Sequence, residues 1–159
     1  ERIKMMRAHG QNKRYHHKYI GMGGRLDTIQ AAILLAKLPH YTQELVDRQQ
    51  VAQHYTDALS DSVQVPVIKS NRSSAWAQYT VRVDNRDTLQ AKLKDNGIPT
   101  AVHYPVSLHL QKCFQYLNYK QGDFPMSEKA SNEVISLPMS SFLTNNQVGY
   151  VVSKIQENI

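Results

Sequence analysis

A glycine-dense loop that runs directly into an apolar helix constrains this chain more than any other segment. The stretch 21–38 reads GMGGRLDTIQAAILLAKL, with Arg25 behind the glycines and Asp27 opening the helical periodicity. Glycines let backbone N–H groups turn towards one point and let a ligand approach closely. A helix start adds the positive end of its dipole. The loop therefore predicts one of two structures. The first is a phosphate-binding site that uses Arg25, and the second is a tight turn whose arginine is solvated or paired with Asp27 or a helix end.

Hydrophobic periodicity and turn signals predict an α+β fold. Pro39 separates an apolar helix over 27–38 from a longer amphipathic helix over about 40–60. The rest of the chain reads as a small sheet with covering helices. Its expected elements are strands at 75–83 and 100–104, and helices at 84–96 (with Gly97 closing it), about 125–136 and 145–157.

Two domains are expected from this order. Residues 1–60 form a helical segment whose apolar faces are costly to leave exposed, so it would join or pack on a further domain and a dimer partner. Residues 61–159 form the small α+β domain. The opening ERIKMMR has the pattern of a helix interior, with neither a cap nor an initiating methionine, which favours a piece of a longer protein.

The charge of +6 is concentrated at the start of the chain, because residues 1–20 hold six lysines and arginines against Glu1 alone. Such a cluster suits a phosphorylated small molecule, a nucleic-acid backbone or a solvated segment. No nucleic-acid partner is expected, because the basic stripe does not continue and no zinc-finger or RNP-like motif occurs. His16 and His17 lack a third ligand at metal spacing, so no metal is expected either.

The single cysteine, Cys113, fits a reducing, cytoplasmic setting, and its apolar neighbours predict a small buried residue. No apolar run reaches the roughly 18 residues that a membrane span needs, so no membrane partner is expected.

Motifs spread over the whole chain resemble, in order, the C-terminal part of the DegT-type nucleotide-sugar aminotransferases. These are pyridoxal-phosphate (PLP) enzymes of the aspartate-aminotransferase fold, also called fold type I. The motifs are HGQ (9–11), RYHHKYIG (14–21), GRLDTIQAAILLAKL (24–38), Arg48, HYP (103–105), LHLQ (108–111), GDFP (122–125) and SLP (136–138).

The resemblance implies a parent enzyme that transfers an amino group to a keto sugar of a nucleotide-sugar, for polysaccharide or glycan biosynthesis. It also implies that the Schiff-base lysine lies upstream of the position that matches Glu1. PLP chemistry needs that amine as covalent anchor and proton shuttle. We therefore expect no catalytic residue in this chain, no PLP bound to it alone, and no activity in isolation.

The same resemblance assigns candidate site residues. The loop matching 21–25 reaches the neighbouring subunit's cofactor phosphate in a G-x-N-x-R pattern, in which Gly23 replaces the asparagine and Arg25 keeps the arginine. The HYP and LH motifs match a segment that lines the sugar-nucleotide pocket; the alternative is a packed turn fixed by Pro105. The substrate-binding candidates are Tyr15, His16, His17, Lys18, His103, Tyr104 and His109.

Two functions from different classes follow. The first is the C-terminal part of a PLP-dependent sugar aminotransferase that works as a homodimer. The alternative is a non-catalytic module that binds a protein partner or an anionic polymer through basic residues 1–20.

Overall fold

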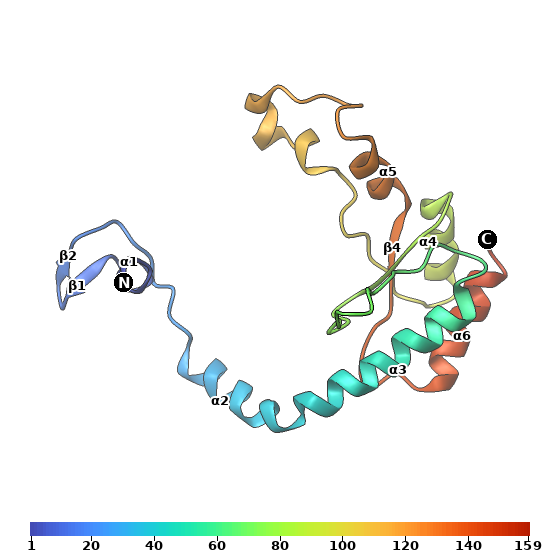
Figure 1. Ribbon diagram of the computed structural model, residues 1–159, viewed down its shortest axis with the longest axis horizontal. Helices are drawn as coiled ribbons and strands as arrows, with labels where there is room; N and C mark the ends of the chain where they lie inside the picture. The colour runs from blue at the N-terminus through green and yellow to red at the C-terminus, as the bar shows by residue number, and fades with distance from the viewer. The chain divides into compact units, whose positions relative to one another are not determined.

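The computed structural model describes residues 1–159 as two units that divide after Thr42 (Figure 1). The first unit consists of short elements and one longer helix. These are α1 (Arg2–Met6), a hairpin of β1 (Gln11–Lys13) and β2 (His16–His17), helix α2 (Thr28–Lys37) and the 3-10 turn η1 (Leu38–His40).

Helix α2 begins and ends where the sequence predicts. The Asp27 carboxylate accepts the Ile29 backbone N–H at 2.8 Å, which satisfies one of the free amides of the first turn. Pro39 lies in the first turn of η1, so the break between the two N-terminal helices is confirmed. No residue of α2 is buried.

Close backbone approach holds the first unit together. Gly10 has a φ of +76°, and a Cβ built on it would lie 1.7 Å from the Tyr19 carbonyl oxygen. A Cβ on Gly21 would lie 2.4 Å from the Met6 carbonyl oxygen. Only glycine permits these approaches.

The second unit surrounds a short antiparallel sheet. Its elements are α3 (Tyr41–Leu59), whose first two residues belong to the first unit, β3 (Tyr79–Arg82), α4 (Arg86–Asp95), η2 (Leu108–Leu110), η3 (Lys112–Leu117), α5 (Pro125–Glu133), β4 (Val134–Leu137) and α6 (Asn145–Gln156).

Strands β3 and β4 pair from Tyr79 opposite Leu137 to Arg82 opposite Val134. Single antiparallel bridges extend the sheet at both edges. Gln64 pairs with Arg82 beside β3, and Ala101 pairs with Ser136 beside β4. Helices α3, α4 and α6 supply most of the apolar cover, and α4 contacts both β4 and α6.

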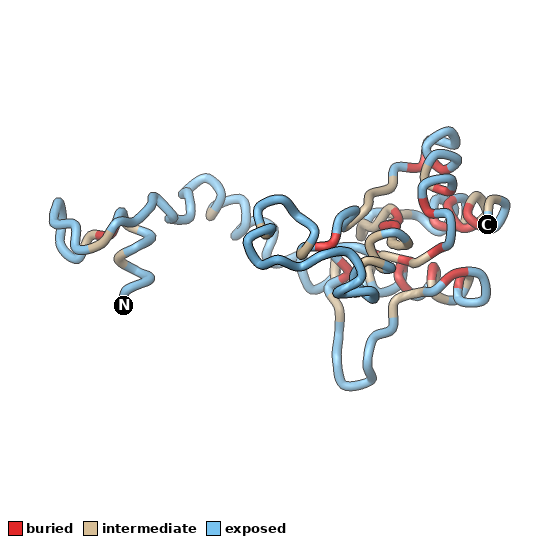
Figure 2. The backbone as a smooth tube through the Cα atoms, turned by 90° about the horizontal axis from the view of Figure 1, so that it is seen from above, coloured by how far each residue is buried: buried red, intermediate tan, exposed pale blue.

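The apolar core belongs entirely to the second unit, where the buried segments gather in Figure 2. Tyr55 and Tyr79 are fully buried, and their rings lie 5.1 Å apart. The Tyr55 hydroxyl donates to the Pro138 carbonyl at 3.0 Å, so its polar atom is satisfied. Burial, and then the neighbouring Tyr79, raise the pKa of Tyr55 far above its ordinary value.

The α+β fold class is confirmed, but the expected strand 75–83 forms only over Tyr79–Arg82. Trp76, placed on the polar side by alternation, is buried with a φ of +48°. Its indole N–H donates to the Gln49 side chain at 2.7 Å, and its carbonyl accepts from Arg48 at 3.0 Å. Contacts with α3 therefore override the alternating pattern before Tyr79.

The sequence-based prediction was also wrong about the strand that pairs with β3. The expected strand 100–104 reduces to the bridge at Ala101, and the helix expected to reach Ser136 ends at Glu133. Val134–Leu137 is strand β4 instead. Short apolar runs fit a buried strand or a helix equally well, and here pairing with β3 decides. The expectation for Cys113 was wrong as well, since this residue is exposed.

The structure divides after Thr42, whereas the expected domain boundary lies at residue 60, where α3 ends. The second half of α3 packs in the core of the second unit through Val51, Ala52, Tyr55 and Leu59. The joining role expected for residues 1–60 stays a prediction. None of the helices combines the length and apolar character that crossing a membrane requires.

Candidate functional site

A cavity of about 550 Å³ with both polar and apolar walls opens beside His103 in the second unit, and it is called the His103 cavity below. The histidine follows the edge bridge at Ala101, so the sheet fixes its position. Its Nδ1 and the Ser136 Oγ share a hydrogen bond of 3.1 Å, and Ser136 Oγ lies 2.8 Å from Thr80 Oγ1. The other residues that line the cavity are Tyr104, Pro105, Val106, Ser107, Leu108, Gln111, Ser127, Ala130, Ser131 and Val134.

Tyr104 is the exposed neighbour of this half-buried histidine. Its side chain is 72% exposed, and its ring meets the His103 ring edge-on at 5.7 Å. The alternative of a turn with both side chains packed therefore does not describe Tyr104. An imidazole and a free phenol at one cavity wall offer hydrogen bonds to hydroxyl or phosphate oxygens.

Three serines also line the His103 cavity. Ser107 is buried, and its Oγ lies 3.0 Å from that of Ser131. The Ser127 hydroxyl donates to Ser107 at 3.2 Å. Sequence reasoning missed these residues, because isolated serines carry no pattern that distinguishes a cavity wall from a loop. Ser136 belongs to the SLP motif, but sequence reasoning gave it no role.

His109 does not join His103 and Tyr104 at this cavity. Its Nε2–H donates to the Glu128 carboxylate at 3.0 Å, and its ring lies 4.8 Å from that of Phe124. His109 instead lines a second cavity of about 310 Å³, called the aromatic cavity below. The aromatic cavity is lined chiefly by Leu108, His109, Phe114, Tyr119, Phe124 and Ser127.

Glu128 anchors the segment before α5. It accepts the Gly122 backbone N–H at 2.9 Å as well as the His109 bond. Burial raises the pKa of this carboxyl, but the hydrogen bonds from Gly122, His109 and Phe124 outweigh burial and hold the pKa below its usual value. The GDFP motif thus has a structural explanation in the turn that Glu128 closes.

In the first unit, Gly23 and Arg25 lie exposed on the glycine loop. The Gly24 N–H donates to the Arg7 carbonyl at 2.8 Å and the Met22 N–H to the Met6 carbonyl at 2.9 Å, so the loop amides do not all converge on one open point. Arg25 has no ion pair with Asp27, whose carboxylate instead caps α2. The guanidinium therefore stays open to an outside anion.

A Cβ on Gly23 would lie 3.1 Å from Cε1 of the His9 ring. His9 thus borders the position where the related pattern has an asparagine side chain. The HGQ motif could have drawn attention to His9, but sequence reasoning gave it no role.

The remaining candidates lie on the β1–β2 hairpin. Tyr15 has a φ of +66° at the hairpin turn, with the Arg14 guanidinium 5.0 Å from its ring. The His17 Nδ1–H donates to the His9 carbonyl at 2.8 Å. His16 and Lys18 are exposed, so this hairpin presents a basic aromatic surface. No group of three or more His, Cys, Asp or Glu side chains is placed to hold a metal ion.

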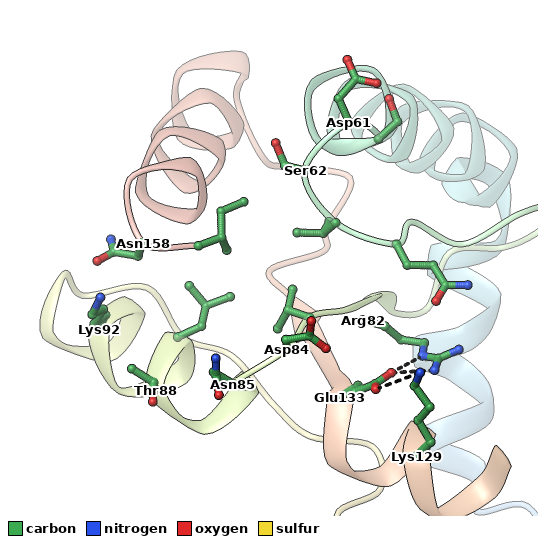
Figure 3. Close-up of a pocket in the computed structure, with 16 residues that line it drawn as sticks. Asp61, Ser62, Arg82, Asp84, Asn85, Thr88, Lys92, Lys129, Glu133 and Asn158 are labelled. Carbon is green, nitrogen blue, oxygen red and sulfur yellow. Dashed lines mark hydrogen bonds and ion pairs between the residues drawn. The ribbon is translucent and has the colours of Figure 1, made fainter. Parts of the chain in front are cut away.

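Another cavity, of about 770 Å³, lies elsewhere in the second unit, between the segment that follows α3, helix α4 and the C-terminal half of α5 (Figure 3). Some of its charged side chains pair with one another: Arg82 pairs with Glu133 at 2.5 Å, and Lys129 approaches the same carboxylate at 3.7 Å. Lys92, Asp61 and Asp84 also line the cavity, so three cationic side chains and three carboxylates surround it. This balance offers no preference for an anion or a cation.

Comparison with known proteins identifies the family. Residues 1–156 match the model of the DegT/DnrJ/EryC1/StrS aminotransferase family. A pleiotropic regulatory protein of Geobacillus stearothermophilus is 44% identical over 99% of this chain and 43% of its own length. The UDP-2-acetamido-2-deoxy-3-oxo-D-glucuronate aminotransferase of Pseudomonas aeruginosa is 42% identical over 96% of this chain and 42% of its own length.

The fold agrees with this match. The crystal structure of a DegT DnrJ EryC1 StrS aminotransferase from Brucella abortus superposes with a TM-score of 0.89 at 36% identity. The match covers 98% of this chain and 42% of the Brucella abortus chain. The chain therefore spans less than half the length of these relatives. With the family model matched over nearly all its residues, the chain belongs to the DegT/DnrJ/EryC1/StrS aminotransferase family.

Proposed function

We propose that this chain forms the C-terminal, substrate-binding part of a PLP-dependent aminotransferase that aminates a keto sugar of a nucleotide-sugar. The observation that carries the proposal is the His103 cavity, which is built from the HYP and LHLQ motifs inside the family match. The Pseudomonas aeruginosa relative, named as an aminotransferase of a UDP-linked 3-oxo sugar, supports this substrate class.

The residues present do not by themselves form a complete PLP site. A Schiff-base lysine works from an enclosed position that lowers its pKa. Every lysine here is exposed except Lys154, which is half-buried and donates to Glu157 at 2.6 Å. That pair raises the pKa of Lys154, opposite to what a nucleophilic amine needs. The covalent chemistry would therefore come from residues outside this chain.

Within the proposed enzyme, the chain binds and orients substrate. His103 and Tyr104 donate hydrogen bonds to sugar hydroxyls or diphosphate oxygens, and Ser136 holds the imidazole through its Nδ1. Arg25 is proposed to contact the cofactor phosphate. Gly23 is proposed to lie beside the same phosphate, although it lacks the side-chain hydrogen bond that the family's asparagine would make. Tyr15, His16, His17, Lys18 and His109 remain proposed substrate neighbours.

A homodimer and a cytoplasmic setting complete the proposal. Supporting the dimer, α2 exposes Ile29, Ile33, Leu34 and Leu35 although these residues are apolar. Large exposed apolar faces of this kind are typical of interaction surfaces.

The test joins this chain in frame to the coding sequence that precedes it and assays amino transfer from glutamate to a UDP-linked keto sugar. We expect transfer by the joined protein, and about a 10–100-fold lower kcat/KM for His103→Ala, because lost orientation and hydrogen bonding both weaken the transition-state complex. His54→Ala, a half-buried histidine on α3, serves as the control and should leave the rate unchanged.

Arg25→Ala in the same joined protein should weaken binding of inorganic phosphate or the UDP-sugar. An unchanged affinity would make Arg25 structural only. Absence of amino transfer by the joined wild-type protein would contradict the proposed function itself.

A further inference from the structure

The SLP motif (136–138) supplies the hydroxyl that bonds to His103, and the sheet fixes this hydroxyl from two sides. Ser136 lies on β4 directly opposite Thr80 of β3. On its other side, the Ser136 backbone N–H donates to the Ala101 carbonyl at 2.8 Å. The residue is only 5% exposed. Its hydroxyl is therefore placed by the backbone pairing of the sheet before any ligand arrives.

Three polar side chains form a single hydrogen-bonded row, called the hydroxyl chain below. Thr80 Oγ1 lies 2.8 Å from Ser136 Oγ, and Ser136 Oγ lies 3.1 Å from His103 Nδ1. A hydroxyl has one proton to donate, so Ser136 donates either to Thr80 or to His103. The direction of the hydroxyl chain therefore determines whether Nδ1 of His103 accepts a proton or carries one.

Counting the donors favours one direction. Thr80 Oγ1 has no other hydrogen-bond partner among the side chains and backbone groups of the protein. If Thr80 donates to Ser136 and Ser136 donates to His103, both hydroxyl protons and the Nδ1 lone pair are used. The opposite direction leaves the proton of the half-buried Thr80 without an acceptor in the protein, which costs free energy.

We propose that Ser136 is a positioning residue that holds His103 in the neutral tautomer whose proton lies on Nε2. The hydrogen bond at one ring nitrogen selects which nitrogen of a neutral histidine is protonated. Nδ1 then bonds to the sheet, whereas Nε2 has no partner in the protein and the ring lines the His103 cavity.

This tautomer limits what His103 can do. Nε2–H is a donor only, so it can contact a lone pair of an oxygen, and it has no lone pair of its own with which to remove a proton. For the nucleotide-sugar of the proposed function, on which this step rests, the contacted group is a carbonyl, hydroxyl or phosphate oxygen. His103 therefore serves as a hydrogen-bond donor in substrate binding and not as a general base.

The experiment records two-bond proton–nitrogen correlation spectra of the histidine rings in the full 159-residue chain, because these distinguish a protonated ring nitrogen from a bare one. At about pH 8, histidines with an ordinary pKa are neutral. The resonances of His103 are those that the variant His103→Gln lacks. We expect a protonated Nε2 and a bare Nδ1 in the wild type.

Ser136→Ala removes the donor to Nδ1, so the two nitrogen resonances of His103 should move towards each other as the second tautomer becomes populated. Ser136→Thr keeps the hydroxyl and should restore the wild-type spectrum. Thr56→Val is the matched control. It also removes a hydroxyl that bonds to another hydroxyl at 2.8 Å, that of Tyr79, and it should leave the His103 resonances unchanged.

A protonated Nδ1 in the wild type, or identical His103 spectra in wild type and Ser136→Ala, would overturn the inference. If Ser136→Ala does not fold, the wild-type spectrum still provides the test. In the joined protein, Ser136→Ala should lower kcat/KM about 3–10-fold, and Ser136→Thr should recover it. These spectra need no substrate, so failure of the tautomer is distinguished from failure of the proposed function, which the amino-transfer assay of the joined wild type measures.

Discussion

The two units of this chain are stabilised by different means. The second unit buries eighteen apolar side chains, including Tyr55, Leu59 and Tyr79, around one short sheet. The first unit buries only Gly10, and its order depends on backbone pairing between residues 6–10 and 19–24. The second unit therefore has its own core, whereas the apolar side chains of the first unit remain available to other surfaces.

The largest expected effect lies in the core of the second unit. Leu59→Ala, at a fully buried position, should lower the free energy of unfolding by about 2–5 kcal/mol, because it removes apolar burial and leaves a cavity. Urea denaturation measures this change. Val67→Ala, at an 86% exposed position, is the control and should shift stability by less than about 0.5 kcal/mol. Equal effects of the two variants would contradict the location of the core.

The first unit should respond to glycine substitutions instead. Gly21→Ala places a Cβ 2.3 Å from the Gly10 nitrogen and 2.4 Å from the Met6 oxygen, so the backbone must separate. We expect a cost of about 1–3 kcal/mol in local stability. Hydrogen exchange of the Met22 and Gly24 amides should quicken about tenfold or more.

Gly24→Ala is the matched control in the same loop, since its nearest contact would be 3.5 Å, an ordinary separation. If the two alanine variants showed the same exchange rates, close backbone approach would not be what orders this unit.

The exposed face of α2 provides the third comparison. Ile33 is 55% exposed, so Ile33→Glu should change the unfolding free energy by less than about 0.5 kcal/mol. The same charge should disrupt association through this face, which sedimentation velocity measures as a shift towards the monomer. Gln30→Glu, an exposed polar position on the same helix, is the control. Unchanged association in Ile33→Glu would exclude this face as the dimer contact.

The smallest expected effect concerns pH. The folded pKa of Glu128 lies below its ordinary value of 4.5, so the unfolded chain binds the proton more readily. The stabilisation from Glu128 is therefore fully present above about pH 4.5 and lost as the pH falls through the lowered folded value. Comparing urea denaturation of wild type and Glu128→Gln, we expect their difference in stability to shrink on acidification. A difference that is constant from pH 6 to pH 3 would contradict this role.

Much of the helical structure was predictable because its signals are local. Asp27 caps α2, Pro39 separates the two N-terminal helices, and Gly97 follows α4 with a φ of +73°. Thr144 begins α6 with a reciprocal capping box. Caps and breakers act within a few residues, so a single sequence reveals them.

The sheet and the site were harder because their decisive contacts are distant in sequence. Val134–Leu137 reads as the end of a helix until β3 pairs with it. Ser136 then bonds to both His103 and Thr80, although 33 and 56 residues separate it from them. His109 was grouped with His103 by motif, but Glu128 holds it in a different cavity.

The sequence alone determined the boundaries of α2, the α+β class and the family, because caps, periodicity and ordered motifs are written in consecutive residues. Only the tertiary structure decided which segment completes the sheet, which serines accompany His103, and that aromatic side chains form a cavity of their own. The physical reason is that pairing, burial and cavity shape depend on residues brought together by folding, and no local pattern encodes those distances.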